Sequence, residues 1–332
     1  MAYIDKYRVI FSDDKRILIK CPEDFYGEYT IPDGVIKISD KAFSCCEHLT
    51  QVVVPNTVSH IGDLAFLACV RLSCINIPPS VISIGKGAFA HCRFLSEINI
   101  PEGDIKLGDF IFDDSGICKP LYTASQFIYM PRFKEGVYEI SEGIKKIVGG
   151  AFADCKMLTN VIIPNSVIEI GNFAFRNCTN IQTPIYNKHI FAYLPNSYEG
   201  EYTIPYGIST IAGGAFNNCT LLTNIVIPDT VIDIGKFAFK NCNNLTTPIL
   251  NKHVFAYLPS LYIGEFTIPN GVEMIAGGAF YGCNKLSNII IPDSVTSIGD
   301  YAFAKCDCLI NITTPNGVRY MSSNDFDTKE NQ

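Results

Sequence analysis

Residues 55–69 read PNTVSHIGDLAFLAC, and residues 164–178 read PNSVIEIGNFAFRNC. Both stretches follow the template Pro-x-x-Val-x-x-Ile-Gly-x-x-Ala-Phe-x-x-Cys-x-x-Leu-x-x-Ile-x-Ile, after which the next proline comes at once. One such unit cannot bury its own apolar side chains, but stacked copies bury them together. The template therefore predicts one continuous solenoid that shares a single core along its length.

The spacing of the template prolines sets the number of predicted coils. Pro32, Pro55, Pro78 and Pro101 are each 23 residues apart, whereas three units are longer, at 40 or 41 residues. The long units cover 101–140, 164–204 and 228–268, and a 64-residue super-repeat results in the second half. Counting each long unit as one coil gives about ten coils over residues 32–315.

The extra segments of the long units resemble one another. Residues 184–195 read PIYNKHIFAYLP, and residues 248–259 read PILNKHVFAYLP. We predict that these segments are inserted β-hairpins that project as spaced ridges. Residues 1–31 contain a similar segment and are predicted to form an N-terminal capping hairpin. Residues 316–332 lack the template and are predicted to form a C-terminal cap followed by a frayed tail.

Each part of the template has its own predicted local structure. The Leu-x-x-Ile-x-Ile part has a period of two and many β-branched residues, so it predicts a short strand that the following proline ends. The Val-x-x-Ile-Gly part predicts a second short extended segment. The Ala-Phe-x-x-Cys part has the apolar spacing of one helical turn. Together these parts predict an α/β solenoid, a curved right-handed coil with a parallel sheet on one side and helical turns on the other.

This repeat resembles the BspA-type leucine-rich repeat family, and the likeness covers about residues 8–315. The 23-residue period lies within the range of leucine-rich repeats. The resemblance implies a surface or secreted adhesin, or an antigen-like protein, that contacts a host protein, matrix or glycan. It does not identify the ligand.

Composition and charge exclude several classes of function. The net charge is −7 and no run of lysine or arginine forms a basic stripe, so we expect no nucleic-acid partner. No stretch approaches the roughly 18 apolar residues of a membrane span, and we expect no direct membrane insertion. The first residues lack the apolar segment of a signal peptide. The cellular location of the protein therefore stays open: the protein is either on the cell surface or secreted, or it is inside the cell.

The fourteen cysteines do not indicate a metal or a disulfide framework. Nine occupy the template slot, where parallel neighbouring side chains point the same way, so we predict a ladder of buried thiols. Cys74 is expected to face outward. No CxxC pair suggests zinc, and the Gly-Gly pairs before Ala-Phe lack the Gly-Lys-Ser/Thr of a phosphate-binding loop. We therefore predict no catalytic residues, no metal and no cofactor, and classify the chain as non-enzymatic.

Two surfaces are the predicted contact sites for a protein or glycan partner. The first is the outward face of the strands, which is small, polar and nearly uncharged and in which asparagine recurs although it is a poor strand former. The second is the set of tyrosines on the inserted hairpins, which suit protein or glycan contact. The strand-face candidates are Thr159, Asn160, Ile162, Thr223, Asn224, Val226, Ser287, Asn288 and Ile290, and the hairpin candidates are Tyr186, Tyr193, Tyr198, Tyr257 and Tyr262.

Two functional interpretations remain open on the sequence. The first is an adhesion module that acts at the cell surface or after secretion. The second is an intracellular scaffold for protein–protein interaction, which the unpaired thiols and the missing leader favour.

Overall fold

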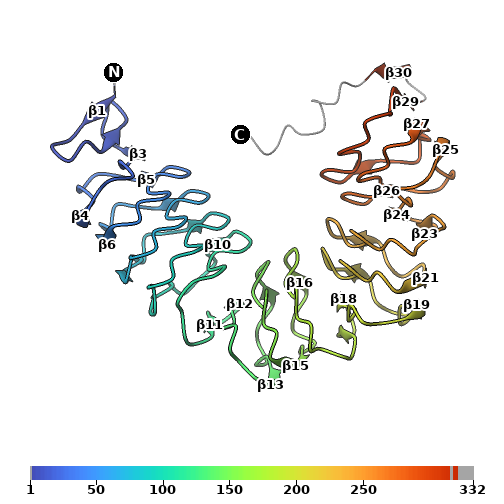
Figure 1. Cartoon of the computed structure of the whole chain (residues 1–332), viewed down its shortest axis with the longest axis horizontal. Helices are drawn as coiled ribbons and strands as arrows, with labels where there is room; N and C mark the ends of the chain where they lie inside the picture. Colours follow the sequence, from blue (N-terminus) through green and yellow to red (C-terminus); the bar gives the residue numbers. More distant parts are fainter. Residues whose placement is uncertain (1, 315–316, 321–332) are drawn as a thin grey trace. The chain divides into compact units, whose positions relative to one another are not determined.

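A computed structural model describes residues 2–314 and 317–320 of the chain. The chain divides into two compact units, and Figure 1 draws it coloured along the sequence. Unit 1 comprises Met1–Lys134 and Ser141–Cys155, and unit 2 comprises Glu135–Ile140 and Lys156–Gln332. The prediction of a cap and tail over 316–332 falls largely outside the described residues.

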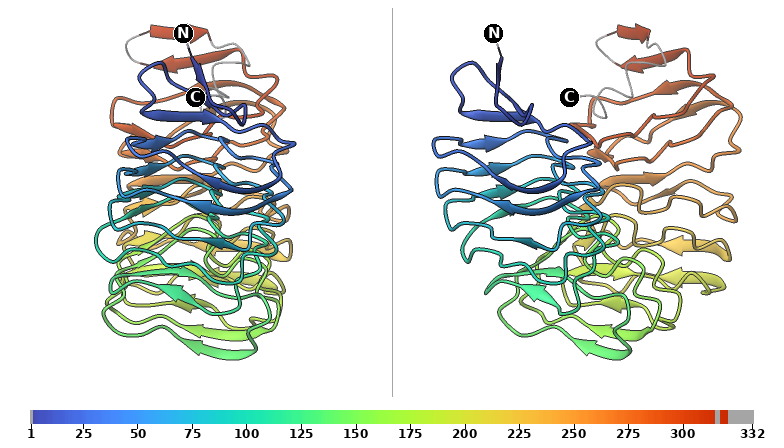
Figure 2. Two further views of the ribbon diagram at one scale, coloured as in Figure 1. Left: turned by 90° about the vertical axis from the view of Figure 1, so that its left-hand side faces the viewer. Right: turned by 60° about the vertical axis from the view of Figure 1, so that its left-hand side comes forward.

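In unit 1, successive turns contribute short strands to two ladders (Figure 2). The ladder that contains the template Leu-x-x-Ile strand is called the Leu side, and the ladder whose strands precede the template glycine is called the Gly side. The Leu side has the order β4-β6-β8, and the Gly side has the order β1-β2-β3-β5-β7-β9-β10. The strands are β1 (Tyr3–Ile4), β2 (Ile10–Phe11), β3 (Ile17–Lys20), β4 (Gly27–Thr30), β5 (Lys37–Ile38), β6 (Leu49–Val53), β7 (His60–Ile61), β8 (Cys74–Ile75), β9 (Ser83–Ile84), β10 (Lys106–Leu107), β11 (Leu121–Tyr122), β12 (Gln126–Tyr129) and β14 (Lys146–Ile147).

Unit 2 has the same two kinds of ladder. Its Leu side consists of β13-β15, β19-β21 and β25-β27-β29-β30, and its Gly side includes β17-β18-β20-β22 and β23-β24-β26-β28. The strands are β13 (Gly136–Glu139), β15 (Leu158–Ile162), β16 (Glu169–Ile170), β17 (Ile185–Tyr186), β18 (Ile190–Tyr193), β19 (Gly200–Thr203), β20 (Thr210–Ile211), β21 (Leu222–Val226), β22 (Asp233–Ile234), β23 (Ile249–Leu250), β24 (Val254–Tyr257), β25 (Gly264–Thr267), β26 (Met274–Ile275), β27 (Leu286–Ile290), β28 (Ser297–Ile298), β29 (Asn311–Thr314) and β30 (Gly317–Tyr320).

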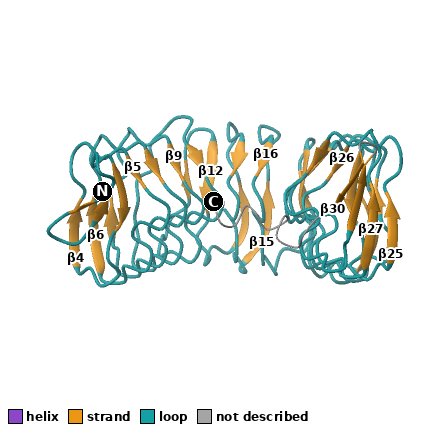
Figure 3. Ribbon diagram, turned by 90° about the horizontal axis from the view of Figure 1, so that it is seen from above, coloured by secondary structure: helices purple, strands orange, loops and turns teal. Residues whose placement is uncertain are grey.

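The predicted helical turn in the Ala-Phe-x-x-Cys slot is wrong, because the residues that the structure describes contain no helix (Figure 3). Leu64 and Ala68 both have a φ of 55°, in the left-handed region that a right-handed helix does not use. The N–H groups of Leu64 and Phe66 donate to the carbonyls of Lys86 and Ala88 in the next turn, each at 2.8 Å. Hydrogen bonds between turns therefore replace those of a helix, and the fold is a parallel-strand β-solenoid rather than an α/β one.

Each long unit forms two turns, not one coil with a projecting hairpin. In residues 164–204, β17 and β18 do pair antiparallel, as predicted. However, β18 also pairs in parallel with β20, and β19 pairs in parallel with β21, so the segment lies within the stack. Doubling the three long units raises the total among the described residues from the predicted ten to about 13 turns.

Proline explains why the Leu-side ladder of unit 2 is interrupted. Pro184 and Pro248 follow Ile181 and Leu245, at the place where a 23-residue coil continues its strand. Proline has no N–H to donate to a ladder. These two turns accordingly have no strand on the Leu side, and the strands that flank them form separate small sheets.

Phenylalanine rings of the Ala-Phe slot form the centre of each core. Phe43, Phe66 and Phe89 of unit 1 stack with ring centroids 4.9 and 5.1 Å apart. In unit 2, Phe216 and Phe239 stack at 4.8 Å. These separations match the distance of about 4.8 Å between neighbouring strands, because each turn advances the stack by one strand.

The template cysteines form the predicted ladder of buried thiols. The Cys69 thiol donates to the carbonyl of Phe43 at 3.0 Å, and the Cys92 thiol donates to that of Phe66 at 3.1 Å. Burial raises the pKa of Cys92 and of Cys155 to about 12. Eight ladder members are buried and one is half-buried: Cys46, Cys69, Cys92, Cys155, Cys178, Cys219, Cys242 and Cys283, then Cys306.

Candidate partner-binding surface

The strand-face candidates of unit 2 lie on the outward side of β15, β21 and β27. Thr159, Thr223 and Ser287 are exposed, and Asn160, Asn224 and Asn288 are half-buried. Ile162 and Val226 are 46% and 51% exposed, whereas Ile290 is half-buried. All nine side chains are therefore accessible on one side of unit 2.

Strand pairing adds acidic residues that the sequence interpretation missed. Glu201 and Thr203 on β19 pair with Asn224 and Val226 on β21. Glu265 and Thr267 on β25 pair with Asn288 and Ile290 on β27, and Val137 and Glu139 on β13 pair with Asn160 and Ile162 on β15. The surface is therefore acidic as well as polar, unlike the nearly uncharged face that was predicted.

A signal for Glu201 and Glu265 was present in the sequence. Residues 200–205 read GEYTIP and residues 264–269 read GEFTIP, so the glutamate recurs one residue after a glycine. Both stretches follow the segments that were interpreted as inserted hairpins. Because the second turn of each long unit was not recognised, its strand was not placed beside the template strand.

Asparagine on the outward face of these strands has a structural role. Gly136 and Val137 of β13 pair with Leu158 and Asn160 of β15. The pairing skips Thr159, which therefore forms a bulge. The Asn160 side chain accepts a hydrogen bond from the N–H of Val161 at 2.8 Å. Asn288 donates to Glu265 across the strands at 2.5 Å. Asparagine therefore stabilises the local backbone and the strand pair. Its recurrence in the sequence is consistent with this structural role as well as with partner binding.

Two of the five hairpin tyrosines are buried. Tyr193 and Tyr257 are 4% and 8% exposed, and their hydroxyls donate to the carbonyls of Cys178 and Cys242 at 3.2 and 3.4 Å. Burial raises the pKa of Tyr193, and it raises that of Tyr257 to about 12. Every side chain of β18 and β24 is buried, unlike those of their parallel neighbours β20 and β26.

The other three tyrosines differ in exposure. Tyr186 is 46% exposed and its ring stacks on Phe191 with 6.1 Å between centroids. Tyr198 and Tyr262 are half-buried, and their hydroxyls donate to the carbonyls of Glu201 and Glu265, each at 3.0 Å. Tyr198 and Tyr262 therefore support the strands that carry these glutamates, and Tyr186 alone of the five is an exposed aromatic side chain.

Among residues 2–314, no three histidine, cysteine, aspartate or glutamate side chains are arranged to hold a metal ion. The His253 ring lies 3.2 Å from Glu273. Cys74 is exposed, as predicted, and Cys45, Cys118 and Cys308 are exposed as well. The described part of the chain also contains no helix that is long and apolar enough to cross a membrane.

The structure is a leucine-rich-repeat solenoid. It has stacked turns, two ladders of mainly parallel strands and a buried row of stacked phenylalanine rings. The family model of the BspA type leucine rich repeat region matches residues 25–135, 127–246 and 248–331. These matches cover most of the sequence, so the chain belongs to this family. Repeat solenoids of this kind are binding scaffolds.

Several solved structures are similar to this chain. A leucine-rich cell-surface protein from Faecalibacterium prausnitzii A2-165 shares 26% identity, with 98% of this chain and 97% of that chain covered and a TM-score of 0.40. A leucine-rich repeat protein from Bacteroides ovatus ATCC 8483 shares 22% identity over 94% and 92% of the two chains, with a TM-score of 0.37. The pneumococcal vaccine antigen PcpA shares 17% identity over 94% and 71%, with a TM-score of 0.33. No curated protein matches the chain.

Proposed function

We propose that this chain is a non-catalytic module that binds a protein partner on the Leu side of unit 2. The outward side chains of the pairs β13/β15, β19/β21 and β25/β27 are called the acidic-aliphatic surface. The observation that carries the proposal is its threefold repetition: each pair presents one glutamate and one exposed or half-buried Ile or Val on its outward side. Glu139 pairs directly with Ile162, whereas Glu201 and Glu265 lie diagonally opposite Val226 and Ile290.

The chemistry of this surface defines the kind of partner. Ile162, Val226 and Ile290 supply apolar area, and Glu139, Glu201 and Glu265 supply negative charge at the same strand pairs. A complementary surface has aliphatic or aromatic side chains flanked by lysine or arginine. We propose that the partner is a protein with such a patch, because apolar contact and charge pairing act together there.

Photo-crosslinking tests this proposal. A benzophenone amino acid replaces Val226 or Ile290 in one set of variants, and Tyr206 or Ile232 in a control set whose side chains are 86% and 61% exposed but lie outside the surface. We expect Val226 and Ile290 variants to form an adduct of one defined mass on producing cells. Equal adducts from the control positions, or none from the surface positions, would contradict the proposal.

The location of the partner separates an adhesin from a scaffold. We propose the surface or secreted adhesin as the role, on the support of family membership. Protease treatment of intact producing cells should then cleave this chain. Survival of the chain until the cells are lysed would support the intracellular scaffold instead, and crosslinking in the lysate would identify its partner.

A further inference from the structure

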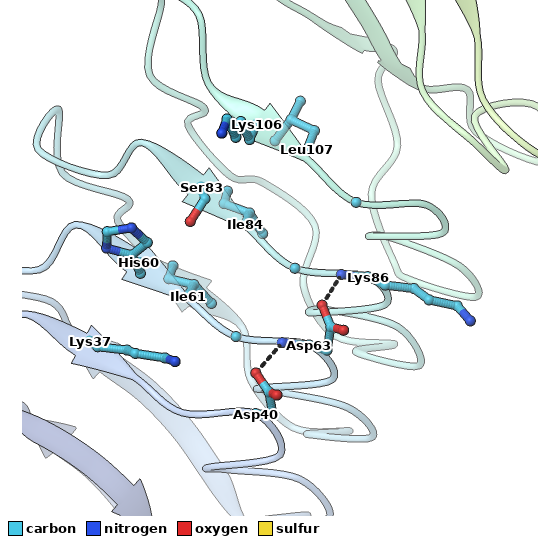
Figure 4. Close-up of a pocket in the computed structure, with 13 residues that line it drawn as sticks. Lys37, Asp40, His60, Ile61, Asp63, Ser83, Ile84, Lys86, Lys106 and Leu107 are labelled. Atoms are coloured by element: carbon cyan, nitrogen blue, oxygen red, sulfur yellow. Dashed lines mark hydrogen bonds between the residues drawn. The ribbon is translucent and has the colours of Figure 1, made fainter. Parts of the chain in front are cut away.

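The Gly side of unit 1 carries a hollow that the proposed function does not use. It has a volume of about 440 Å³ and spans the four neighbouring strands β5, β7, β9 and β10 (Figure 4). Each of these strands contributes one outward side chain in register: Lys37, His60, Ser83 and Lys106. A fifth polar side chain, Lys86, lies where the chain leaves β9.

The lysines of this hollow are available to a ligand. Lys37, Lys86 and Lys106 are exposed, and within the described residues none of the three ammonium groups forms an ion pair. The His60 ring is exposed too and lies 2.7 Å from the hydroxyl of Ser59. In a chain with a net charge of −7, three unpaired lysines around one hollow are a local exception.

Two carboxylates lie on the other side of the same hollow and are partly engaged. One oxygen of Asp40 accepts the N–H of Asp63 at 2.9 Å, and one oxygen of Asp63 accepts the N–H of Lys86 at 2.7 Å (Figure 4). Gly62 makes this possible, because a Cβ at that position would collide with the Asp40 carboxylate. A carboxylate has several acceptor sites, so each aspartate retains capacity for a ligand hydroxyl.

The spacing of the cationic row favours a linear ligand. Neighbouring strands lie about 4.8 Å apart, so Lys37 and Lys106 are separated by about 14 Å along the stack. A small anion bound at one strand therefore does not span this row. A chain that carries a negative group on successive units and runs across the strands contacts Lys37, His60 and Lys106 in turn.

We propose that this hollow binds an acidic polysaccharide, that is, a linear glycan bearing carboxylate or sulfate groups. The lysines and His60 match the anionic groups, while the free oxygens of Asp40 and Asp63 match sugar hydroxyls. An acidic peptide such as polyglutamate has the charge but lacks the hydroxyls that the two aspartates can accept. This site is separate from the acidic-aliphatic surface, which is negatively charged and is proposed to bind a positively charged partner.

Binding to defined polymers tests the proposal with the intact chain. The probes are heparin as a sulfated glycan, polygalacturonate as a carboxylated glycan, dextran as a neutral glycan and poly-L-glutamate as an acidic peptide. We expect binding to one or both acidic glycans that weakens as salt increases, because exposed charges are screened. Absence of binding to both acidic glycans, equal binding to dextran, or tighter binding to poly-L-glutamate would each overturn the proposal.

Matched variants locate the site. Lys37→Gln combined with Lys106→Gln should weaken glycan binding about tenfold, whereas Lys156→Gln combined with Lys285→Gln removes the same charge from exposed positions of unit 2 and should leave it unchanged. Ser83→Lys fills the gap in the row and should strengthen binding about threefold. Equal losses in the two double variants, or no gain from Ser83→Lys while the circular dichroism spectrum is that of the parent chain, would refute the assignment.

Discussion

The Gly-side strands of the two units share one backbone pattern but differ in outward chemistry. In β5, β7, β9 and β10 of unit 1 and in β20, β22 and β26 of unit 2, the second residue is a buried apolar side chain, as in Ile61 and Ile211. The first residue of each of these strands lies on the outward side. Unit 1 places Lys37, His60, Ser83 and Lys106 in that row, whereas unit 2 places Thr210 and Asp233, and Met274 and Ser297.

This difference shows which positions determine the fold and which determine the ligand. Buried slots cannot change without loss of the stacked core, because each turn is stabilised only by its neighbours. Outward slots can change with little effect on stability. The two units can therefore have one fold and two different proposed binding surfaces, the cationic hollow on unit 1 and the acidic-aliphatic surface on unit 2.

The largest expected effect comes from the shared core. Phe66→Ala in unit 1 and Phe216→Ala in unit 2 each remove a fully buried ring from a stack, and each should lower the free energy of unfolding by about 4 kcal/mol. Urea denaturation measures both. Phe94→Ala is the control, since Phe94 is 64% exposed and its loss should cost less than about 0.5 kcal/mol. Unequal losses for Phe66 and Phe216 would show that the two units do not use this slot in the same way.

The template glycine should show the next largest effect. A Cβ on Gly85 would collide with the backbone at Asp63, and a Cβ on Gly235 would collide with the backbone at Gly213. We therefore expect Gly85→Ala and Gly235→Ala each to cost about 3 kcal/mol in the same denaturation assay.

A matched control separates this collision from loss of backbone freedom. Gly27 has a φ of 92° and open space around its Cβ position. Gly27→Ala should therefore cost only about 1 kcal/mol, from backbone conformation alone. A larger loss for Gly27→Ala than for Gly85→Ala would contradict the close approach of neighbouring turns.

The thiol ladder predicts a loss of stability at alkaline pH in both units. Burial raises the pKa of Cys92 in unit 1 and of Cys242 in unit 2 to about 12. In the unfolded chain a thiol releases its proton near pH 8.5. Above that pH the unfolded chain binds fewer protons than the folded one, so the free energy of unfolding falls as pH rises towards 12 and is unaffected below about pH 8.

Single variants isolate the contribution of one thiol. Between pH 8 and pH 10, Cys92→Ala and Cys242→Ala should each reduce the alkaline loss in the free energy of unfolding by about 1.5 kcal/mol. Cys74→Ala removes an exposed thiol and should leave the pH dependence as it is. The measurement is urea denaturation at both pH values, and an equal change for Cys74→Ala would disprove the role of burial.

The fold could be predicted from the sequence wherever buried residues repeat at a fixed period. The stacked turns, the Leu-side strands and the cysteine ladder all follow from apolar positions such as Leu158, Phe175 and Cys178. Two features could not be predicted in this way. Pro184 breaks the period, so the extra turn was interpreted as a hairpin, and the spacing of Ala65, Phe66 and Cys69 is the same for a helical turn as for the two left-handed bends that are present.

The candidate surface was predicted only in part, for a related reason. Thr223, Asn224 and Val226 were placed correctly on an outward face because they belong to a regular coil. Glu201, which pairs with Asn224, was missed because its strand belongs to an unrecognised turn. Tyr193 was expected to be exposed, yet β18 is covered on both sides, and a single segment does not reveal how its neighbours cover it.

The smallest expected effect concerns the residue before the ladder cysteine. Ala68 in unit 1 and Asn218 and Asn241 in unit 2 all have a positive φ, between 55° and 64°. Asparagine adopts this left-handed conformation more readily than alanine, because its short polar side chain forms local hydrogen bonds.

Ala68→Asn should therefore stabilise unit 1 by about 0.5 kcal/mol, since it gives that unit the residue that unit 2 already uses. In unit 2 the side chain of Asn241 donates to that of Asn218 at 2.8 Å, so the reverse change, Asn218→Ala, removes both the conformational preference and this hydrogen bond. It should cost about 1 kcal/mol. A thermal-unfolding comparison of the two variants checks both signs, and a loss of stability in Ala68→Asn would show that the slot in unit 1 is shaped by its own neighbours rather than by backbone conformation.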